Sequence, residues 1–316
     1  MKTSPRKAAL AFTLLLGAVA LAAPAQAQGA AGAPAAAAAQ DGQSATVVLV
    51  AHPVLAALTE TLAQGTGIRV ERAAPANLPA TRHASYFMGR GGKALQTAAG
   101  KAHAVVAMRS VWPDDPLYPM ARRSNIRLVE IDAALPLDGA LSGIALQPGE
   151  RAGSQFAAYP WLGTANLGRM ADIIAADLGR LAPQEQAAID GNLARIKRQL
   201  VEINASSQAA LARAENVSVI SLSERLPYLV SSFNLDLVET MARDDADWTP
   251  ERLQALTAAI RDSGAAAVLM HREADPALRQ AIEAGGAKPV LLHTEGSDPL
   301  GELRQNAQAL QQALAP

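Results

Sequence analysis

Short runs of β-branched and aliphatic residues alternate along the chain with segments whose apolar residues recur at helical spacing. The run 46–50 (TVVLV) is apolar throughout, which is typical of a strand buried on both faces of a parallel sheet. The next segment, 53–64, places Leu55, Leu58 and Leu62 on one helical face. This alternation predicts parallel sheets whose strands are connected by crossover helices.

The alternation occurs in two separate stretches of the chain. In the first stretch we predict a helix at 93–99 and further strands at 68–71, 104–108 and 126–131. In the second stretch the predicted strands are 217–222, 235–239, 265–270 and 289–292. The helices predicted there are 227–233, 250–262, 276–283 and a closing helix that places Leu303, Ala307, Leu310 and Leu314 on one face.

The segment between the two stretches is helical. Residues 166–178 and 183–214 lack strand patterns, and the second places an apolar residue every three or four positions: Ile189, Leu193, Ile196, Leu200 and Ile203. The sequence therefore predicts an α/β protein of two Rossmann-like lobes joined by a long linking helix, with a cleft between the lobes. We expect an N-terminal lobe at 46–165, a helical linker at 166–215 and a C-terminal lobe at 216–316.

The N-terminus has the pattern of an export signal. Lys2, Arg6 and Lys7 precede a small or apolar run at 8–22, and Ala-Gln-Ala at 25–27 provides a cleavage site. We therefore predict a signal peptide at 1–27, with an uncleaved anchor as the alternative. The Ala, Gly, Pro, Gln and Ser composition that follows predicts a disordered tether at 28–45. The expected location is the periplasm, with no stable membrane insertion after cleavage.

Composition narrows the possible functions. The 28 Lys+Arg residues nearly balance the 29 Asp+Glu residues, giving a formal net charge of −1. A nucleic-acid-binding protein needs a basic surplus, and aromatic residues, at 3%, offer few stacking surfaces for bases. The chain contains no Cys, which excludes disulfides, thiolate metal sites and Cys nucleophiles. It also lacks the G-x-S-x-G pattern of one large hydrolase class, so we do not expect a hydrolase of that class.

Polar side chains directly follow several predicted strands. In open parallel sheets, ligands bind beyond the carboxyl ends of the strands. Three of the five histidines in the chain follow such strands, namely His52, His271 and His293. Glu224 and Glu295 follow predicted strands as well. These five residues are therefore candidates for a binding site in the cleft.

Imidazole and carboxylate groups together point to a metal. Neutral imidazole nitrogen is a good ligand for Zn²⁺, and without Cys the His, Glu and Asp residues must supply any such site. His83, in a predicted loop at 82–88, is a fourth candidate, whereas His103 precedes its strand and is assigned a structural role. The spacing contains no H-E-x-x-H motif, so a strand-end hydrogen bond stays the alternative for any single His.

Several local stretches, in the same order along the chain, resemble one protein family. They are His83-Ala84-Ser85-Tyr86, then Pro160-Trp161-Leu162 with Asn166, then Leu226-Pro227-Tyr228 followed by Phe233-Asn234-Leu235, and the closing pattern at 249–286. Over about residues 46–314 the chain resembles the cluster A-I, zinc- and manganese-binding (ZnuA-like) solute-binding proteins of ABC importers. The resemblance implies a protein that is not an enzyme: a monomer that captures a divalent transition metal, with zinc favoured over manganese, and delivers it to a permease in the inner membrane.

The resemblance also implies a set of ligands. The family typically holds its metal with three His and one carboxylate, two from each lobe. The first His matches His83, the second matches Tyr159, and the third matches Ser223, which has Glu224 beside it. The late carboxylate falls near His293 or Glu295.

Two hypotheses follow from these replacements. In the first, the site is rebuilt from His52, His83, His271 and His293, with an oxygen from Glu224 or Glu295 and affinity that falls as the pH drops through about 6.5. Tyr159 offers a phenolate for ferric iron as a variant of this site. In the second, the metal site is lost, and the cleft takes a non-metal or chelated solute or the protein acts as an accessory interaction protein.

Overall fold

The computed structural model describes residues 45–139, 141–149 and 156–315. The predicted signal peptide at 1–27 and all but the last residue of the predicted tether lie outside the described residues. Within the described ranges, no helix is both long enough and apolar enough to cross a membrane.

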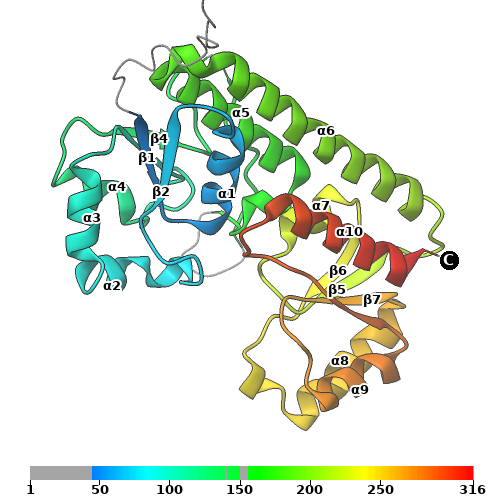
Figure 1. Cartoon of the computed structure of the whole chain (residues 1–316). Coiled ribbons are helices and arrows are strands. Elements are labelled where there is room, and N and C mark those ends of the chain that lie inside the picture. The colour runs from blue at the N-terminus through cyan, green and yellow to red at the C-terminus, as the bar shows by residue number, and fades with distance from the viewer. Residues whose placement is uncertain (1–44, 140, 150–155, 316) are drawn as a thin grey trace, which may run out of the picture. The chain divides into compact units, whose positions relative to one another are not determined.

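The N-terminal lobe is built on a parallel four-stranded sheet (Figure 1). Its strands are β1 (Thr46–Val50), β2 (Ile68–Arg72), β3 (Ala104–Ala107) and β4 (Val129–Asp132), in the order β2-β1-β3-β4. The apolar run of β1 is buried on both faces, as the sequence pattern predicts. Val48 and Val50 join one hydrophobic cluster, while Val47 and Leu49 join another on the opposite face.

The α-helices among the described residues of this lobe are α1 (Pro53–Leu62), α2 (His83–Met88), α3 (Gly92–Ala99) and α4 (Leu117–Arg122). The sequence pattern missed α2 and α4, and the loop predicted at 82–88 is wrong because His83 begins a helix. Each of these helices has six residues, which is too short for an apolar period to be recognised. Each is held by two deeply buried residues, His83 and Phe87 in α2 and Leu117 and Ala121 in α4.

The C-terminal lobe repeats the arrangement of the first. Its strands are β5 (Ser218–Ser221), β6 (Asp236–Thr240), β7 (Ala267–Met270) and β8 (Lys288–Leu291), all parallel in the order β6-β5-β7-β8. Its helices are α7 (Pro227–Ser232), α8 (Pro250–Ser263), α9 (Pro276–Gly285) and α10 (Pro299–Leu314). All four helices have proline in the first turn, where its missing N–H has no intrahelical partner to lose.

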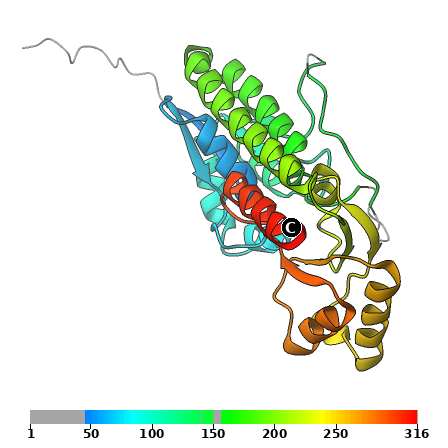
Figure 2. The same ribbon diagram turned by 90° about the vertical axis from the view of Figure 1, so that its right-hand side faces the viewer.

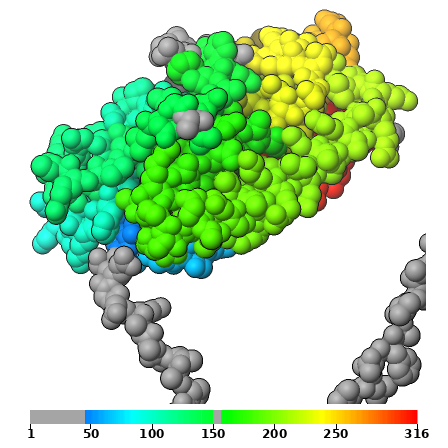
Figure 3. All heavy atoms as spheres, turned by 90° about the horizontal axis from the view of Figure 1, so that it is seen from above, coloured from blue at the N-terminus to red at the C-terminus, as the bar shows by residue number. Residues whose placement is uncertain are grey.

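Two long helices connect the lobes, α5 (Thr164–Leu181) and α6 (Gln186–Leu211). The 26 residues of α6 extend about 39 Å at 1.5 Å per residue. Ile189, Ile196 and Leu200 are buried along one side of α6, which confirms the predicted apolar stripe. The helix packs on α1, α5 and α10, and Figure 2 shows α10 returning from the C-terminal lobe to lie beside it. Seen from above, α5 and α6 cover the region between the two lobes (Figure 3).

The parallel topology fixes where the polar candidates lie. Because neighbouring parallel strands end at the same edge of a sheet, the residues that follow them gather there. His52 follows β1, while Ser223 and Arg225 follow β5. One continuous hydrophobic cluster contains Val48 of β1 and Val219 of β5, so the two lobes share part of their core.

Candidate functional site

The side chain of His52 is buried without a hydrogen-bond partner. It lies between β1 and α1 with 2% of its surface exposed, and its side chain does not cap the helix that it precedes. The ring packs edge-on against Trp161 at 4.6 Å between centroids and against Trp112 at 6.0 Å. Neither Nδ1 nor Nε2 has a hydrogen-bond partner. Burial, followed by the nearby His83, lowers the pKa of His52 to about 3, so the imidazole is neutral at pH 7.

His83 lies close enough to His52 to lower its pKa and is equally buried, at 2% exposure. One ring nitrogen forms a hydrogen bond with the Leu78 backbone, whereas Nε2 has no partner. Burial lowers the pKa of His83 as well. A backbone bond at one nitrogen and a free lone pair at the other is the arrangement that metal-ligating histidines show.

The three unpartnered nitrogens of this imidazole pair are unusual, because buried polar atoms in proteins nearly always have a hydrogen-bond partner. Leaving one unsatisfied costs about 1–3 kcal/mol. Imidazole nitrogens without a proton donor beside them are available to a metal ion, for which Zn²⁺, Cu and Fe are the usual choices.

Tyr159 and Trp161 separate the imidazole pair from the C-terminal lobe. Trp161 is buried and its Nε1 donates a 2.9 Å hydrogen bond to the carbonyl oxygen of Thr294, which follows β8. Tyr159 has a φ of 64°, in the left-handed region that non-glycine residues rarely adopt. This backbone places its ring against Trp161, with 5.0 Å between centroids.

Arg225, in the loop after β5, forms the polar centre of the site. Its Nη1 donates to Glu295 at 3.3 Å and to the Thr294 hydroxyl at 3.2 Å. Its guanidinium carbon lies 4.7 Å from the centroid of the Tyr159 ring. The Tyr159 hydroxyl hydrogen-bonds Glu295, and burial together with the Glu295 charge raises the pKa of Tyr159 to about 12. Tyr159 is therefore a neutral phenol in this structure.

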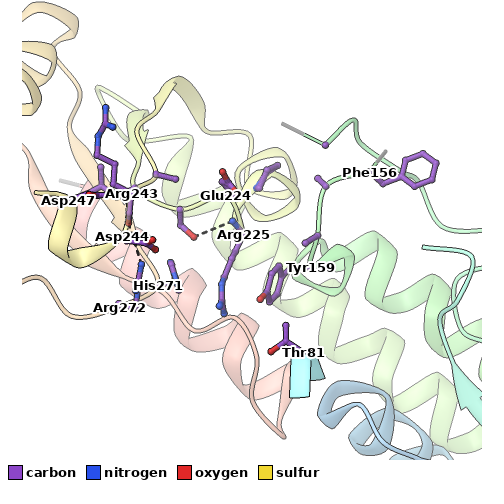
Figure 4. A pocket seen from close by; sticks show the side chains of 17 residues that line it. Thr81, Phe156, Tyr159, Glu224, Arg225, Arg243, Asp244, Asp247, His271 and Arg272 are labelled. Atoms are coloured by element: carbon purple, nitrogen blue, oxygen red, sulfur yellow. Dashed lines mark hydrogen bonds between the residues drawn. The ribbon is translucent and has the colours of Figure 1, made fainter. Parts of the chain in front are cut away.

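A cavity of about 560 Å³ opens beside Arg225 and Tyr159 (Figure 4). Thr81, Gly149 and residues 156–159 of the N-terminal lobe line it together with residues of the C-terminal lobe. The charged and polar residues of that lobe along its wall are Ser223, Glu224, Arg225, Arg243, Asp244, Asp247, His271 and Arg272. Burial, followed by the charges of Arg225 and Arg272, lowers the pKa of His271 to about 4.

His293 lies apart from this cavity. It lines a smaller one of about 380 Å³, together with His271 and Glu295. Its backbone is fixed by the side chain of Asn306, which accepts from the His293 N–H and donates to the His293 carbonyl, both at 2.8 Å.

The structure thus distributes the seven residues predicted as ligands over several groups. It brings His52 and His83 together, it pairs Tyr159 with Glu295, and it places Glu224 and His271 on the wall of the larger cavity. Across residues 45–139, 141–149 and 156–315, no three His, Cys, Asp or Glu side chains form a group that would hold a metal ion.

Sequence reasoning missed two residues that shape the site. Arg225 directly follows Glu224 and, like Glu224, lies just after a predicted strand. A guanidinium is not a metal ligand, so a metal site inferred from the sequence does not include it. Trp161 belongs to a stretch on which the family resemblance rests. Its contacts, however, are with His52 and Thr294, each more than 100 residues away along the chain, and local sequence does not predict them.

Comparisons with known proteins agree with this architecture. The model of the family "Zinc-uptake complex component A periplasmic" (ZnuA) matches residues 123–313, more than half of the chain. No protein of curated function matches the sequence.

Solved structures of similar fold include a zinc-bound deletion mutant of ZnuA. It has a TM-score of 0.65 and 19% identity, over 86% of this chain and 99% of that one. Zn(II)-bound AdcA from Streptococcus pneumoniae gives the same TM-score and identity, but this chain covers 59% of its length. FpvC from Pseudomonas aeruginosa in complex with Mn²⁺ has a TM-score of 0.63 and 17% identity, over 86% of this chain and 98% of that one.

These structures share the fold at identities below 25%, while the match of the family model extends over most of the linker and the C-terminal lobe. The protein is not an enzyme but has the architecture of a transport component. The chain belongs to the ZnuA family of periplasmic zinc-uptake components.

Proposed function

We propose that this protein is the periplasmic solute-binding component of an ABC importer for a transition metal, and that His52 and His83 supply the nitrogen ligands. The observation that supports the proposal is the group of three buried imidazole nitrogens without partners. A folded protein that leaves such atoms unsatisfied gains nothing in stability, so a ligand that completes them is the physical reason for keeping them.

Nitrogen donors favour zinc over manganese, because manganese prefers carboxylate and other oxygen ligands. Iron also accepts imidazole, whereas the protonated state of Tyr159 disfavours a ferric phenolate site. Burial lowers the pKa of both histidines, so protons compete less with a metal for them and metal affinity persists to a lower pH than free imidazole would allow. The monomer then delivers the ion to a permease in the inner membrane.

Equilibrium dialysis of the mature chain against buffered Zn²⁺ tests the proposal. We expect close to one zinc per chain, lost in His83→Ala and weakened in His52→Leu. His103→Gln is the matched control, because His103 is exposed and its Nδ1 accepts the Val47 N–H at 3.0 Å. Absence of zinc from the unmodified protein, or full occupancy in both site variants, would refute the assignment.

A further inference from the structure

Basic side chains are concentrated in one segment of the N-terminal lobe. Between residues 73 and 129 the sequence has eight Lys or Arg residues and two acidic residues, Asp114 and Asp115, although the whole chain has a formal net charge of −1. Arg109 is paired with Glu130 at 3.2 Å. The other seven cations are exposed, and none of them forms an ion pair within the described part of the chain. The segment therefore carries a surplus of uncompensated positive charge.

This segment folds into one layer of helices on the sheet. The helices α2, α3 and α4 contact one another, and Phe87, Leu95 and Leu117 are buried together against Val47 and Leu49 of β1. Figure 1 shows the layer on the side of the N-terminal lobe that faces away from the C-terminal lobe. Because apolar side chains fill the inner side of the layer, its exposed cations lie on the outer surface.

Four of the basic residues surround a hollow of about 710 Å³ between α3 and β2, the edge strand of the sheet. They are Arg69, Arg90, Lys93 and Lys101, and we call this hollow the basic groove. The groove has one carboxylate, that of Glu71, which is bound to Arg69 at 3.0 Å. That pair is neutral as a unit. Arg90, Lys93 and Lys101 therefore leave three positive charges without a negative partner in the groove.

The positive surface continues from the basic groove to the loop after α4. The side chain of Asn125 donates to the carbonyl oxygens of Ala99 and Ala102, both at 3.0 Å, and so holds this loop beside the end of α3. Arg123 and Arg127 lie on either side of Asn125, and both are exposed. The charges are thus spread over a surface that is wider than one small anion.

The same segment also exposes apolar side chains. Among the described residues, the two most exposed large apolar side chains are Ile126, at 80%, and Met88, at 74%. Met88 is the last residue of α2, and Ile126 follows Asn125. A bilayer with anionic headgroups provides phosphates for cations and an apolar boundary for such side chains, whereas a small soluble anion provides only charge.

We propose that the N-terminal lobe binds the surface of an anionic phospholipid membrane through the basic groove and the adjoining loop after α4, with Met88 and Ile126 entering the headgroup region. The inference goes beyond the proposed function, because it needs neither a metal nor the imidazole pair. Reversible binding of this kind would hold the protein at the membrane in which a permease lies and would confine its search for that partner to the membrane surface.

Co-sedimentation of the mature protein with lipid vesicles tests the proposal. We expect binding to vesicles of equal parts phosphatidylglycerol and phosphatidylcholine, and little binding to phosphatidylcholine alone. Binding should weaken strongly as NaCl rises from about 50 mM to about 500 mM, because salt screens exposed charges. The double variant Lys93→Gln with Lys101→Gln should bind about 25-fold more weakly, since each cation near an anionic surface contributes roughly a fivefold factor.

A second double variant controls for the change in net charge. Arg198→Gln with Arg304→Gln removes two exposed cations from α6 and α10, away from the basic groove, and should bind the vesicles as the unmodified protein does. Circular dichroism and zinc dialysis of the Lys93 and Lys101 variant should match those of the unmodified protein. These measurements show that it is folded, and they keep the inference separate from the metal site.

The outcomes decide for or against a membrane-binding surface. Binding that needs phosphatidylglycerol, weakens with salt and is lost in the Lys93 and Lys101 variant but not in the control supports it. Equal binding to both kinds of vesicle, binding that ignores salt, or an equal loss in both double variants overturns it. Inorganic phosphate that displaces the protein more than chloride of the same ionic strength indicates a small-anion site instead, and this also overturns it.

Discussion

Replacing His52 by leucine is expected to make the metal-free protein more stable. The imidazole is buried against Trp161 and Trp112, with two ring nitrogens that have no partner. An unsatisfied buried polar atom costs about 1–3 kcal/mol, and leucine fills a similar space without such atoms. The side chain takes no part in capping α1, so the helix start loses nothing. We expect a gain of about 2 kcal/mol at pH 7.

A lower pH should increase the difference in stability between His52→Leu and the unmodified protein. The pKa of His52 is about 3 in the folded protein and 6.5 for the unperturbed group. Between these values the unfolded chain binds the proton more tightly, so the native state loses stability as the pH falls from 6.5 toward 3. At pH 5 the loss from this one group is about 2 kcal/mol. His52→Leu removes that contribution, and the expected advantage of the variant at pH 5 is therefore about 4 kcal/mol.

Urea unfolding followed by circular dichroism, in the presence of a chelator at pH 7 and pH 5, measures both effects. Added zinc should stabilise the unmodified protein more than the variant, because only a ligand that binds the native state raises its stability. His103→Leu is the control; it loses the part-buried hydrogen bond from the Val47 N–H and should cost about 1 kcal/mol. A His52→Leu protein that is less stable at pH 7 and equally acid-sensitive would refute the reasoning.

Two other substitutions test the framework around the site. Asn306→Leu removes both hydrogen bonds that fix the backbone of His293 and leaves those backbone groups unpaired, so we expect a loss of about 2–4 kcal/mol in urea unfolding; an unchanged midpoint would show that water replaces the amide. Burial raises the pKa of Asp115 to about 6 against 3.8 for the unperturbed group, so the native state loses stability as the pH rises from 4 to 6. Asp115→Asn keeps an oxygen for the Leu117 N–H and should gain about 2–3 kcal/mol at pH 7 but nothing at pH 4; the same gain at both values would exclude this cause.

Much of the fold can be predicted from the sequence because the patterns that indicate its strands and helices are local. The continuous apolar run of β1 and the apolar stripe of α6 each lie within one element, so the α/β class, the two lobes and the long connecting helix follow from periodicity. Helices of a single turn or two do not display a period. That is why α2, which carries His83, was expected as a loop.

The candidate site can be predicted from the sequence only in part. The rule that ligands bind beyond the ends of parallel strands identified His52, His271 and Glu295, and the structure places each of them after its strand. The rule does not say which of these side chains meet. The rule was combined with a search for imidazole and carboxylate groups. Arg225 was therefore not predicted as a site residue, although it follows the same strand as Glu224.

The sequence by itself determined the helices and strands, their order, and the position of histidines just after several strands. These features depend only on residues a few positions apart. Only the tertiary structure decided that His52 lies beside His83, 31 positions later, and that Arg225 reaches Glu295 across 70 residues. Such long-range contacts depend on strand order, on the packing of α10 against α6 and on the left-handed backbone at Tyr159. Local propensity carries no information about contacts that form only when distant segments share one core.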